Sequence, residues 1–229
     1  MGWVYIQPSN AGAQNTGTTA SLTVNPAISP VAGNTCFLAV GWSGNVGTAI
    51  NSVTDNLGGT WTRTATGMAQ SFIIVDLYYR ENVPSGITAV TINGNGTLYL
   101  SGVFVEFSGG ASSNSLDGTV GAGASTGLAL ISAGPYTPTQ DEELILVLGG
   151  DDSGGFVETA GPGFILLPQF AGAGTKSNIY FEYKVLFDKS TTTCAFGLAT
   201  TRAPWAAFAA GFKAAPDIVS SQLNYALVG

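Results

Sequence analysis

Short β-prone runs separated by turn residues recur from one end of this 229-residue chain to the other. The runs are rich in Val, Ile, Phe, Tyr, Trp and Thr, the breaks are clusters of Gly, Asn, Pro and Ser, and no stretch keeps the periodicity of an amphipathic helix. Gly accounts for 32 residues, and only 9% of residues are charged. This pattern predicts an all-β protein with many turns.

The predicted strands fall into two sets, divided by turn signals such as Asn93-Gly94-Asn95-Gly96. The first set covers residues 3–7, 18–24, 35–42, 49–54, 61–65, 72–80, 89–92 and 98–107. The second set covers residues 128–132, 143–149, 156–160, 164–170, 177–187, 192–199 and 205–212, with a last strand at 222–228.

The second set resembles the first at an offset of roughly one hundred residues, which indicates an internal repeat. In each half an apolar strand and a polar loop are followed by an aromatic strand ending in a basic residue, and then by a long aromatic strand. The matched stretches are 36–41 with 144–149, 76–80 with 180–184, and 99–107 with 205–212. Two similar four-stranded units are therefore expected.

Such units form either two small domains or two Greek keys in one sandwich. The chain has too few charged residues to cover two separate surfaces, so we expect a single jelly-roll-like β-sandwich. Its core is predicted at 31–213, with halves at 31–107 and 128–213 and a Gly- and Ser-rich linker at 108–127. Residues 1–30 are expected to add N-terminal strands, and residues 214–229 a C-terminal arm.

Most residues that carry enzyme chemistry are scarce. There is no His, which removes the commonest general base and the usual ligand of catalytic zinc. The formal charge is −7, and the seven Lys and Arg residues are spread singly, so the clustered cations that bind nucleic acid are missing. No apolar run approaches the roughly 20 residues of a membrane helix. We predict a protein that is not an enzyme, has no cofactor, and binds neither nucleic acid nor a membrane.

Two cysteines, Cys36 and Cys194, lie far apart in the sequence and form no CxxC motif. Zinc and thioredoxin-type functions are therefore not indicated. Each cysteine lies in an apolar β-prone run, where an unpaired thiol behaves as a small buried hydrophobic group. Burial as free thiols is favoured over one disulfide, which stays open.

Acidic residues are candidates for catalysis and for calcium binding. Glu106 and Glu182 lie within predicted strands among aromatic residues, but a place on the outer sheet surface explains them equally well, and nothing selects glycoside hydrolysis. Asp151 and Asp152 begin an oxygen-rich loop that is a weak calcium candidate, because it lacks the alternating acids of a dedicated calcium loop. A solvated acidic turn is the simpler interpretation.

Carbohydrate binding is a further candidate, because sugars stack on exposed aromatic faces beside amides and carboxylates. Trp42 ends a predicted strand near Asn45, and Trp61 follows the hairpin that contains Asp55 and Asn56. These five residues would line a groove at one end of the sandwich. The alternative is that both tryptophans fill the ends of the core.

The two ends of the chain are short, apolar and β-prone. The candidate contact residues are Trp3 and Tyr5 at the N-terminus and Leu223, Tyr225 and Leu227 at the C-terminus. Such segments either cover sheet edges of their own chain or extend the sheet of a neighbouring chain. Both uses stay open.

The order of segments resembles a jelly-roll, concanavalin-like β-sandwich module that recurs in bacterial secreted proteins and phage virion surface proteins. The stretches that carry the likeness are 31–40, 53–62, 79–83, 87–92, 105–109 and 205–213, so the resemblance covers about residues 31–213. It implies a sandwich fold and a role in attachment or display. No catalytic residues come with it.

These observations lead to one expected function and one alternative. We expect a structural or display protein on a virion surface or outside the cell, such as a phage capsid decoration or fibre-type protein. It would assemble through its terminal strands with copies of itself or with capsid or filament proteins. The alternative is a carbohydrate-binding adhesin or lectin-like module that uses the tryptophan groove.

Overall fold

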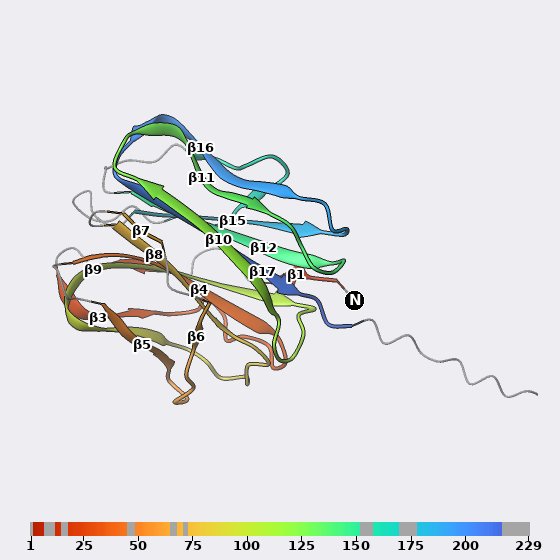
Figure 1. The fold of residues 1–229 in the computed structure, drawn as a ribbon. Helices are drawn as coiled ribbons and strands as arrows, with labels where there is room; N and C mark the ends of the chain where they lie inside the picture. The colour runs from red at the N-terminus through yellow and green to blue at the C-terminus, as the bar shows by residue number, and fades with distance from the viewer. Residues whose placement is uncertain are drawn as a thin grey trace, which may run out of the picture.

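The computed structural model confirms an all-β protein, in which antiparallel sheets pack on one another as a β-sandwich (Figure 1). The structure describes residues 2–6, 12–14, 18–44, 49–64, 68–70, 73–151, 158–169 and 178–216. In this part of the chain every regular element is a strand.

The strands form two successive groups. The first group is β1 (Val4–Tyr5), β2 (Gly12–Gln14), β3 (Thr19–Val24), β4 (Thr35–Gly44), β5 (Ile50–Asp55), β6 (Thr62–Arg63), β7 (Met68–Gln70), β8 (Ile73–Arg80) and β9 (Val90–Ser108). The second group is β10 (Leu116–Ala124), β11 (Leu128–Tyr136), β12 (Glu143–Asp151), β13 (Glu158–Thr159), β14 (Ile165–Leu166), β15 (Asn178–Leu186), β16 (Thr192–Arg202) and β17 (Trp205–Lys213).

Strand β9 takes part in both layers of the first half. Its later residues lie between β4 and the short strands β1 and β2, whereas its first residues pair with β3 and β5. The turn predicted at residues 93–96 is therefore wrong, because the strand continues through it. Gly94 is suited to this place, since a Cβ atom there would lie 2.6 Å from Leu98 Cδ1. The turn residues mark the passage of one strand from layer to layer.

The second half repeats this arrangement with separate strands. Strands β10, β17, β12, β15 and β14 form a five-stranded sheet, and β11, β16 and β13 form the second layer. Strand β16 corresponds to the first part of β9, and β17 to its later part. The predicted repeat therefore extends through both layers of each half.

The strand ladders correct the predicted alignment of the halves by one residue. Cys36 points into the core between the two layers of its own half, whereas Leu144, its predicted counterpart, points into the core between the halves. Its true counterpart is Ile145, which faces the layers of the second half. Side chains alternate along a strand, so a slip of one residue exchanges the two faces.

The two halves pack through their larger sheets and bury a central core that includes Phe37, Leu77, Leu146, Phe181 and Phe212. Strand β8 lies against β12 and β17, and β15 lies against β4 and β9, so equivalent strands make reciprocal contacts. Such reciprocity is the property of a twofold, isologous interface. Figure 1 shows the halves stacked, with the strands of residues up to 108 below and the later ones above.

This layering explains the continuous apolar runs of the sequence. Strands β4 and β12 are covered on both faces, by the central core on one side and by the smaller layer of their own half on the other. A strand buried on both faces needs apolar residues at successive positions rather than at alternate ones.

The predicted linker is the main point at which the structure differs from the expected domain organisation. Residues 108–127 contain β10, nine residues long, which pairs along most of its length with β17. Its sequence, Leu-Asp-Gly-Thr-Val-Gly-Ala-Gly-Ala, has the small-residue composition of a flexible connection. The pairing with β17 overrides that local preference.

Candidate functional site: an open strand edge

The two tryptophans of the predicted groove are part of the core. Trp42 and Trp61 are only 5% and 4% exposed, so their ring faces are not available for stacking with a sugar. Trp42 Nε1 donates to Asp76 Oδ2 at 2.8 Å, and Trp61 Nε1 donates to Asp55 Oδ2 at 3.2 Å. Both rings fill the sandwich, as the simpler alternative proposed.

The other groove residues hold turns. Asp55 Oδ1 accepts from the backbone N–H groups of Leu57 and Gly59 at 3.0 Å, and its side chain also forms a salt bridge with Arg80. Asn56 is exposed, but its side chain accepts from Thr88 N at 2.8 Å and also bonds the neighbouring turn. Asn45 lies outside the described residues. These groups therefore fix the hairpin that precedes Trp61.

The second half contains a counterpart of the Trp42 and Asp76 pair with its partners exchanged. Cys36 on β4 and Ile145 on β12 are equivalent positions. Six residues further along each strand, Trp42 therefore corresponds to Asp151. Asp76 on β8 likewise corresponds to Tyr180 on β15, and the Tyr180 hydroxyl donates to Asp151 Oδ2. In both pairs an aromatic donor bonds a buried carboxylate on the neighbouring strand, but the strand that carries each group is exchanged between the halves.

The same contacts show where Asp151, the first residue of the calcium candidate, lies. Asp151 is buried and accepts from Asn178 Nδ2 at 2.7 Å as well as from Tyr180, so it does not belong to a solvated loop. Asp152 lies outside the described residues. Among the residues that the structure describes, no group of three or more His, Cys, Asp or Glu side chains is placed to hold a metal ion.

Glu106 and Glu182 are both buried, which corrects the simpler interpretation of an outer sheet surface. Glu106 Oε1 accepts from Val31 N at 2.8 Å and from Asn34 Nδ2 at 2.6 Å, so it fixes the loop before β4. Glu182 Oε2 accepts from Gly161 N at 2.8 Å, whereas its Oε1 atom has no hydrogen-bond partner in the described part of the chain. Burial raises the pKa of Glu182 to about 8.

Cys36 and Cys194 are both buried free thiols, which confirms the favoured interpretation. Burial, with Glu106 next in importance, raises the pKa of Cys36, and burial, with Glu182 next, raises the pKa of Cys194 to about 12. A thiol with a raised pKa is a poor nucleophile. The two cysteines therefore contribute packing.

The N-terminal strand is used within its own chain. Val4 and Tyr5 pair with Ser108 and Phe107 of β9, and the buried ring of Trp3 donates from Nε1 to Phe212 O at 3.0 Å. Strand β1 thus belongs to a sheet of the first half while Trp3 bonds a strand of the second. Leu223, Tyr225 and Leu227 lie outside the described residues.

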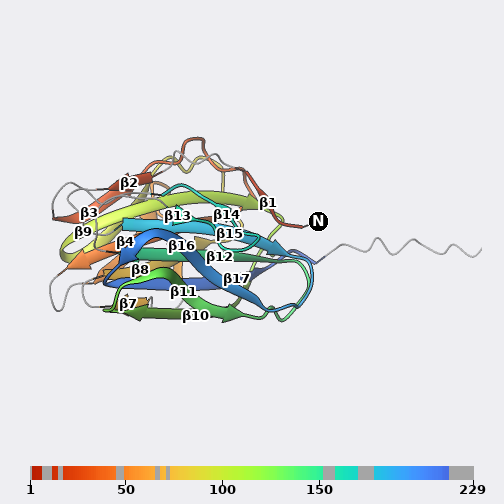
Figure 2. The same cartoon turned by 90° about the horizontal axis from the view of Figure 1, so that it is seen from above.

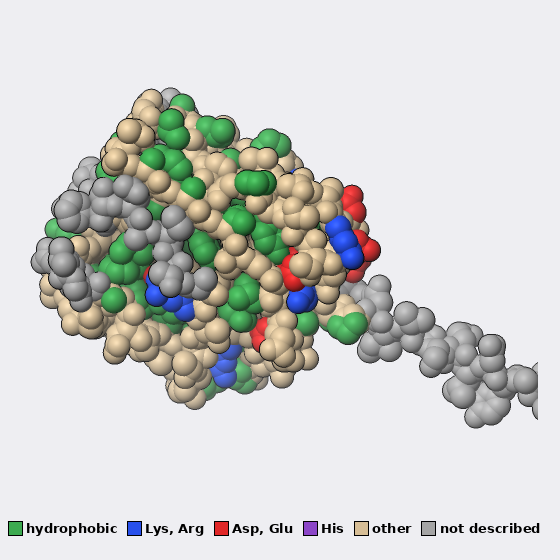
Figure 3. Space-filling model, viewed as in Figure 1, with side chains coloured by type: hydrophobic (Ala, Val, Ile, Leu, Met, Phe, Trp, Pro, Cys, Tyr) green, Lys and Arg blue, Asp and Glu red, His purple; other side chains and the backbone are tan. Residues whose placement is uncertain are grey.

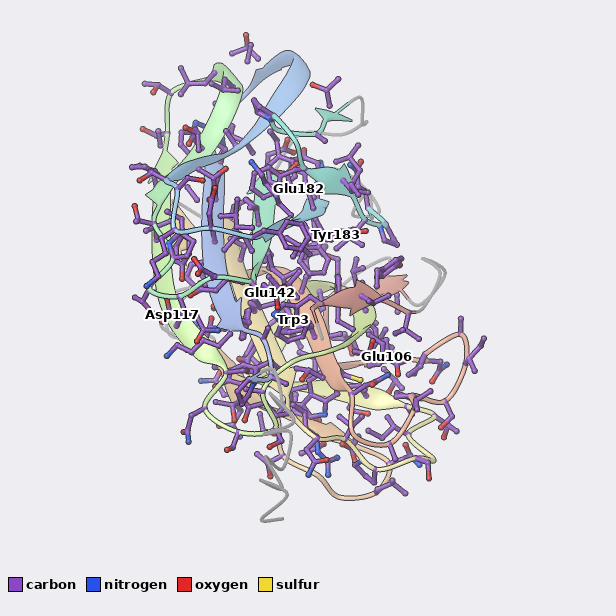
Figure 4. All side chains as sticks on the ribbon, turned by 90° about the vertical axis from the view of Figure 1, so that its right-hand side faces the viewer. Trp3, Glu106, Asp117, Glu142, Glu182 and Tyr183 are labelled. Atoms are coloured by element: carbon purple, nitrogen blue, oxygen red, sulfur yellow. The ribbon has the colours of Figure 1, made fainter. Side chains whose placement is uncertain are left out.

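One side of this strand is hollowed. A cavity of about 540 Å³, here called the seam groove, is lined by Trp3, Val4, Tyr5, Gly163, Ile165, Tyr183, Lys184 and Val185. Val4 and Ile165 are 52% and 56% exposed, and the rings of Tyr5 and Tyr183 lie 5.7 Å apart. Figure 4 shows Trp3 and Tyr183 close together at this junction of the halves.

Strand β10 forms one edge of the five-stranded sheet, and the sequence did not indicate it. It pairs with β17 on one side, and no other described strand pairs with it. Figure 2 places β10 at the outer rim of the molecule. The internal repeat contains one usable signal. Strands β1 and β2 precede β3 in the first half, so a strand is expected before β11, the counterpart of β3, in the second half.

A buried polar cluster fixes the first residues of β10. The Tyr136 hydroxyl lies 3.2 Å from Asp117 Oδ2 and 3.1 Å from Glu143 Oε2, and Lys213 Nζ lies 3.2 Å from Asp117 Oδ1. Burial opposes ionisation of Asp117, but hydrogen bonds from Thr139, and then from its other neighbours, lower its pKa to about 2. Burial, with Asp117 next, raises the pKa of Glu143. The cluster ties together β10, β12 and β17.

The same end of the molecule has a shallow cavity of about 650 Å³, whose lining includes Asp141, Glu142, Phe187, Lys213 and Pro216. Figure 3 shows charged side chains gathered at this end, whereas most of the face over β10 is uncharged. Ala214 and Ala215 are held by backbone bonds to Glu142 and Gly109. The chain therefore leaves its last described strand beside the start of β10.

Comparisons with known proteins give no assignment. No protein-family model matches the chain, and no match is found among curated proteins or solved structures. Among the described residues there is also no helix long and apolar enough to cross a membrane. The function must therefore be inferred from the surfaces above.

Proposed function

We propose that this chain is a non-enzymatic structural protein that assembles with copies of itself on the exterior of a particle, such as a phage virion. The observation that supports this most is the open edge of β10, because an unpaired strand edge binds another strand through backbone hydrogen bonds. The sparse surface charge adds support, since few like charges oppose close packing of copies.

The buried polar groups are consistent with this role. Asp55, Asp76, Glu106 and Asp151 all have hydrogen-bond partners that hold strands and turns together. Groups fixed in this way stabilise a durable coat protein. The virion setting itself depends on the resemblance of residues 31–213 to surface modules of phages.

The proposal predicts that the purified full chain, whose protomer mass is 23.3 kDa, forms a defined oligomer, and that a chain ending at Ala215 has the mass of one shortened protomer. The reason is that residues 217–229 contain the apolar C-terminal segment expected to pair with a neighbour. Light scattering after size exclusion, over a range of protein concentrations, measures both masses. The far-ultraviolet circular dichroism of the shorter chain serves as the folding control.

A full chain that stays monomeric at every concentration would refute assembly with copies of itself. Glycan binding, the second candidate function, would then be favoured. The seam groove favours that candidate, because its lining includes the adjacent rings of Tyr5 and Tyr183 together with Lys184. A glycan array probed with the full chain, and with Tyr183→Ala as the matched variant, tests it; equal signals from both would exclude this groove.

A further inference from the structure

The edge of β10 differs from every other long sheet edge in the described part of the chain. Strands β3 and β11 also pair with one strand only, and so does β5 apart from a bridge between Thr54 and Thr60. Their regular runs are short, with four residues each in β3 and β5 after a shift at the start, and three residues on either side of the second shift in β11. The one shift of β10 comes at its start, between Leu116 and Gly118, and its pairing with β17 is then regular from Gly118 to Ala124. Bulges, prolines and lysines protect edges from pairing, and residues 118–124 contain none of them.

The side chains along this edge are small. Residues 118–124 read Gly-Thr-Val-Gly-Ala-Gly-Ala, and Gly121 is exposed at the centre. Neighbouring strands place their side chains about 5 Å apart, so small residues on one strand leave room for large residues on the next. The edge therefore fits a strand with large apolar side chains at alternate positions.

The C-terminal segment has that pattern. Residues 222–228 read Gln-Leu-Asn-Tyr-Ala-Leu-Val, which places Leu223, Tyr225 and Leu227 on one face of a strand. The segment has the same length as the regular part of β10. It also contains no charged residue and no proline.

Chain length decides that the segment would come from a second copy. The last described residue, Pro216, lies near the start of β10, because Phe212 is the ladder partner of Leu116. An antiparallel partner must begin near Ala124, about 26 Å away along the strand at roughly 3.3 Å per residue. The connection from Pro216 to residue 222 spans at most about 20 Å. The segment of the same chain therefore cannot reach that position in the antiparallel direction of this sheet.

We propose that residues 222–228 of one copy add to the open edge of β10 in a second copy as an antiparallel strand. This inference rests on the proposed function and names the two surfaces that meet. Backbone hydrogen bonds would join the strands, and the alternate large side chains would cover the small residues of β10.

Two full-length variants test it, each defective in one surface. Gly121→Lys places a charge on the receiving edge and leaves the C-terminal segment intact. Leu223→Asp with Leu227→Asp disrupts the segment and leaves the edge intact. Ser21→Lys, on the exposed edge strand β3, is the matched control. Circular dichroism and thermal unfolding check that all variants fold.

Each defective variant alone is expected to have the 23.3 kDa mass of a single chain, whereas the Ser21→Lys variant keeps the mass of the wild type. An equimolar mixture of the two defective variants is expected to form a dimer of twice that mass, because each supplies the surface that the other lacks. If folded Gly121→Lys keeps the wild-type mass, or if the mixture forms no dimer, the pairing is wrong. A monomeric wild type would instead refute the proposed function itself.

Discussion

Replacing Trp3 with alanine is expected to lower the free energy of unfolding by about 3–5 kcal/mol, the usual cost of removing a buried tryptophan. The ring lies 6.1 Å from Phe37 and 6.3 Å from Phe107, measured between centroids, and its Nε1 atom donates to Phe212 O. Its loss would open a cavity between the halves and leave that carbonyl without its bond. Urea unfolding followed by circular dichroism gives the value.

Two matched variants separate these contributions. Trp3→Phe keeps an aromatic ring and loses the N–H donor, so it should cost less, at about 1–2 kcal/mol. Val4→Ala, at the exposed neighbouring position, should change stability by less than about 0.5 kcal/mol. If Trp3→Ala instead left stability unchanged and altered the mass of the oligomer, Trp3 would be a contact between copies, contrary to its position in the structure.

Replacing Glu182 with glutamine is expected to stabilise the protein at alkaline pH and to have little effect near pH 4.5. The carboxyl group has a pKa of about 8 in the fold, against an ordinary value of 4.5. Between pH 4.5 and pH 8 the folded chain keeps a proton that the unfolded chain releases. The stability that the wild type owes to this neutral carboxyl group is therefore fully present below pH 4.5 and is lost as the pH rises to 8. At about 1.4 kcal/mol per unit, the loss in the wild type reaches up to about 5 kcal/mol.

The difference in unfolding free energy between wild type and Glu182→Gln, measured from pH 4.5 to 8.5, isolates this effect. Other titrating groups are shared by both proteins and cancel. Glu106→Gln is the matched control. The Glu106 carboxylate accepts two hydrogen bonds, so this substitution should lower the free energy of unfolding at pH 8. A Glu182→Gln difference that does not grow with pH would contradict a neutral, buried carboxyl group.

The sequence was sufficient for the fold class and for the repeat, because both depend on patterns within short segments. Alternating turns and apolar runs mark the strands, and the same order of strands occurs twice. The alignment of Cys36 with Leu144 failed by one residue, since a run that is apolar at every position gives no sign of which face is which. Only the packing of four layers distinguishes the two faces.

The candidate site was less predictable, because it depends on contacts between distant segments. Trp42 and Trp61 lie near turns in the sequence, which suggested exposure, but their N–H groups bond inside the core, to Asp76 on β8 and to Asp55 in the preceding hairpin. Residues 116–124 looked like a linker because glycine and alanine have low intrinsic preference for strands. Pairing with β17 stabilises them as β10, and that pairing is invisible to local composition.

The twofold contact between the halves has a consequence for how this surface can change. In a dimer of identical chains every substitution occurs twice, so an edge that becomes adhesive on one subunit becomes adhesive on both. Here both partners belong to one chain, and each position varies independently, as the exchanged Trp42–Asp76 and Asp151–Tyr180 pairs illustrate. The counterparts of β10 in the first half are the short strands β1 and β2. Each chain would therefore contribute one receiving edge and one donated segment to an assembly built on β10.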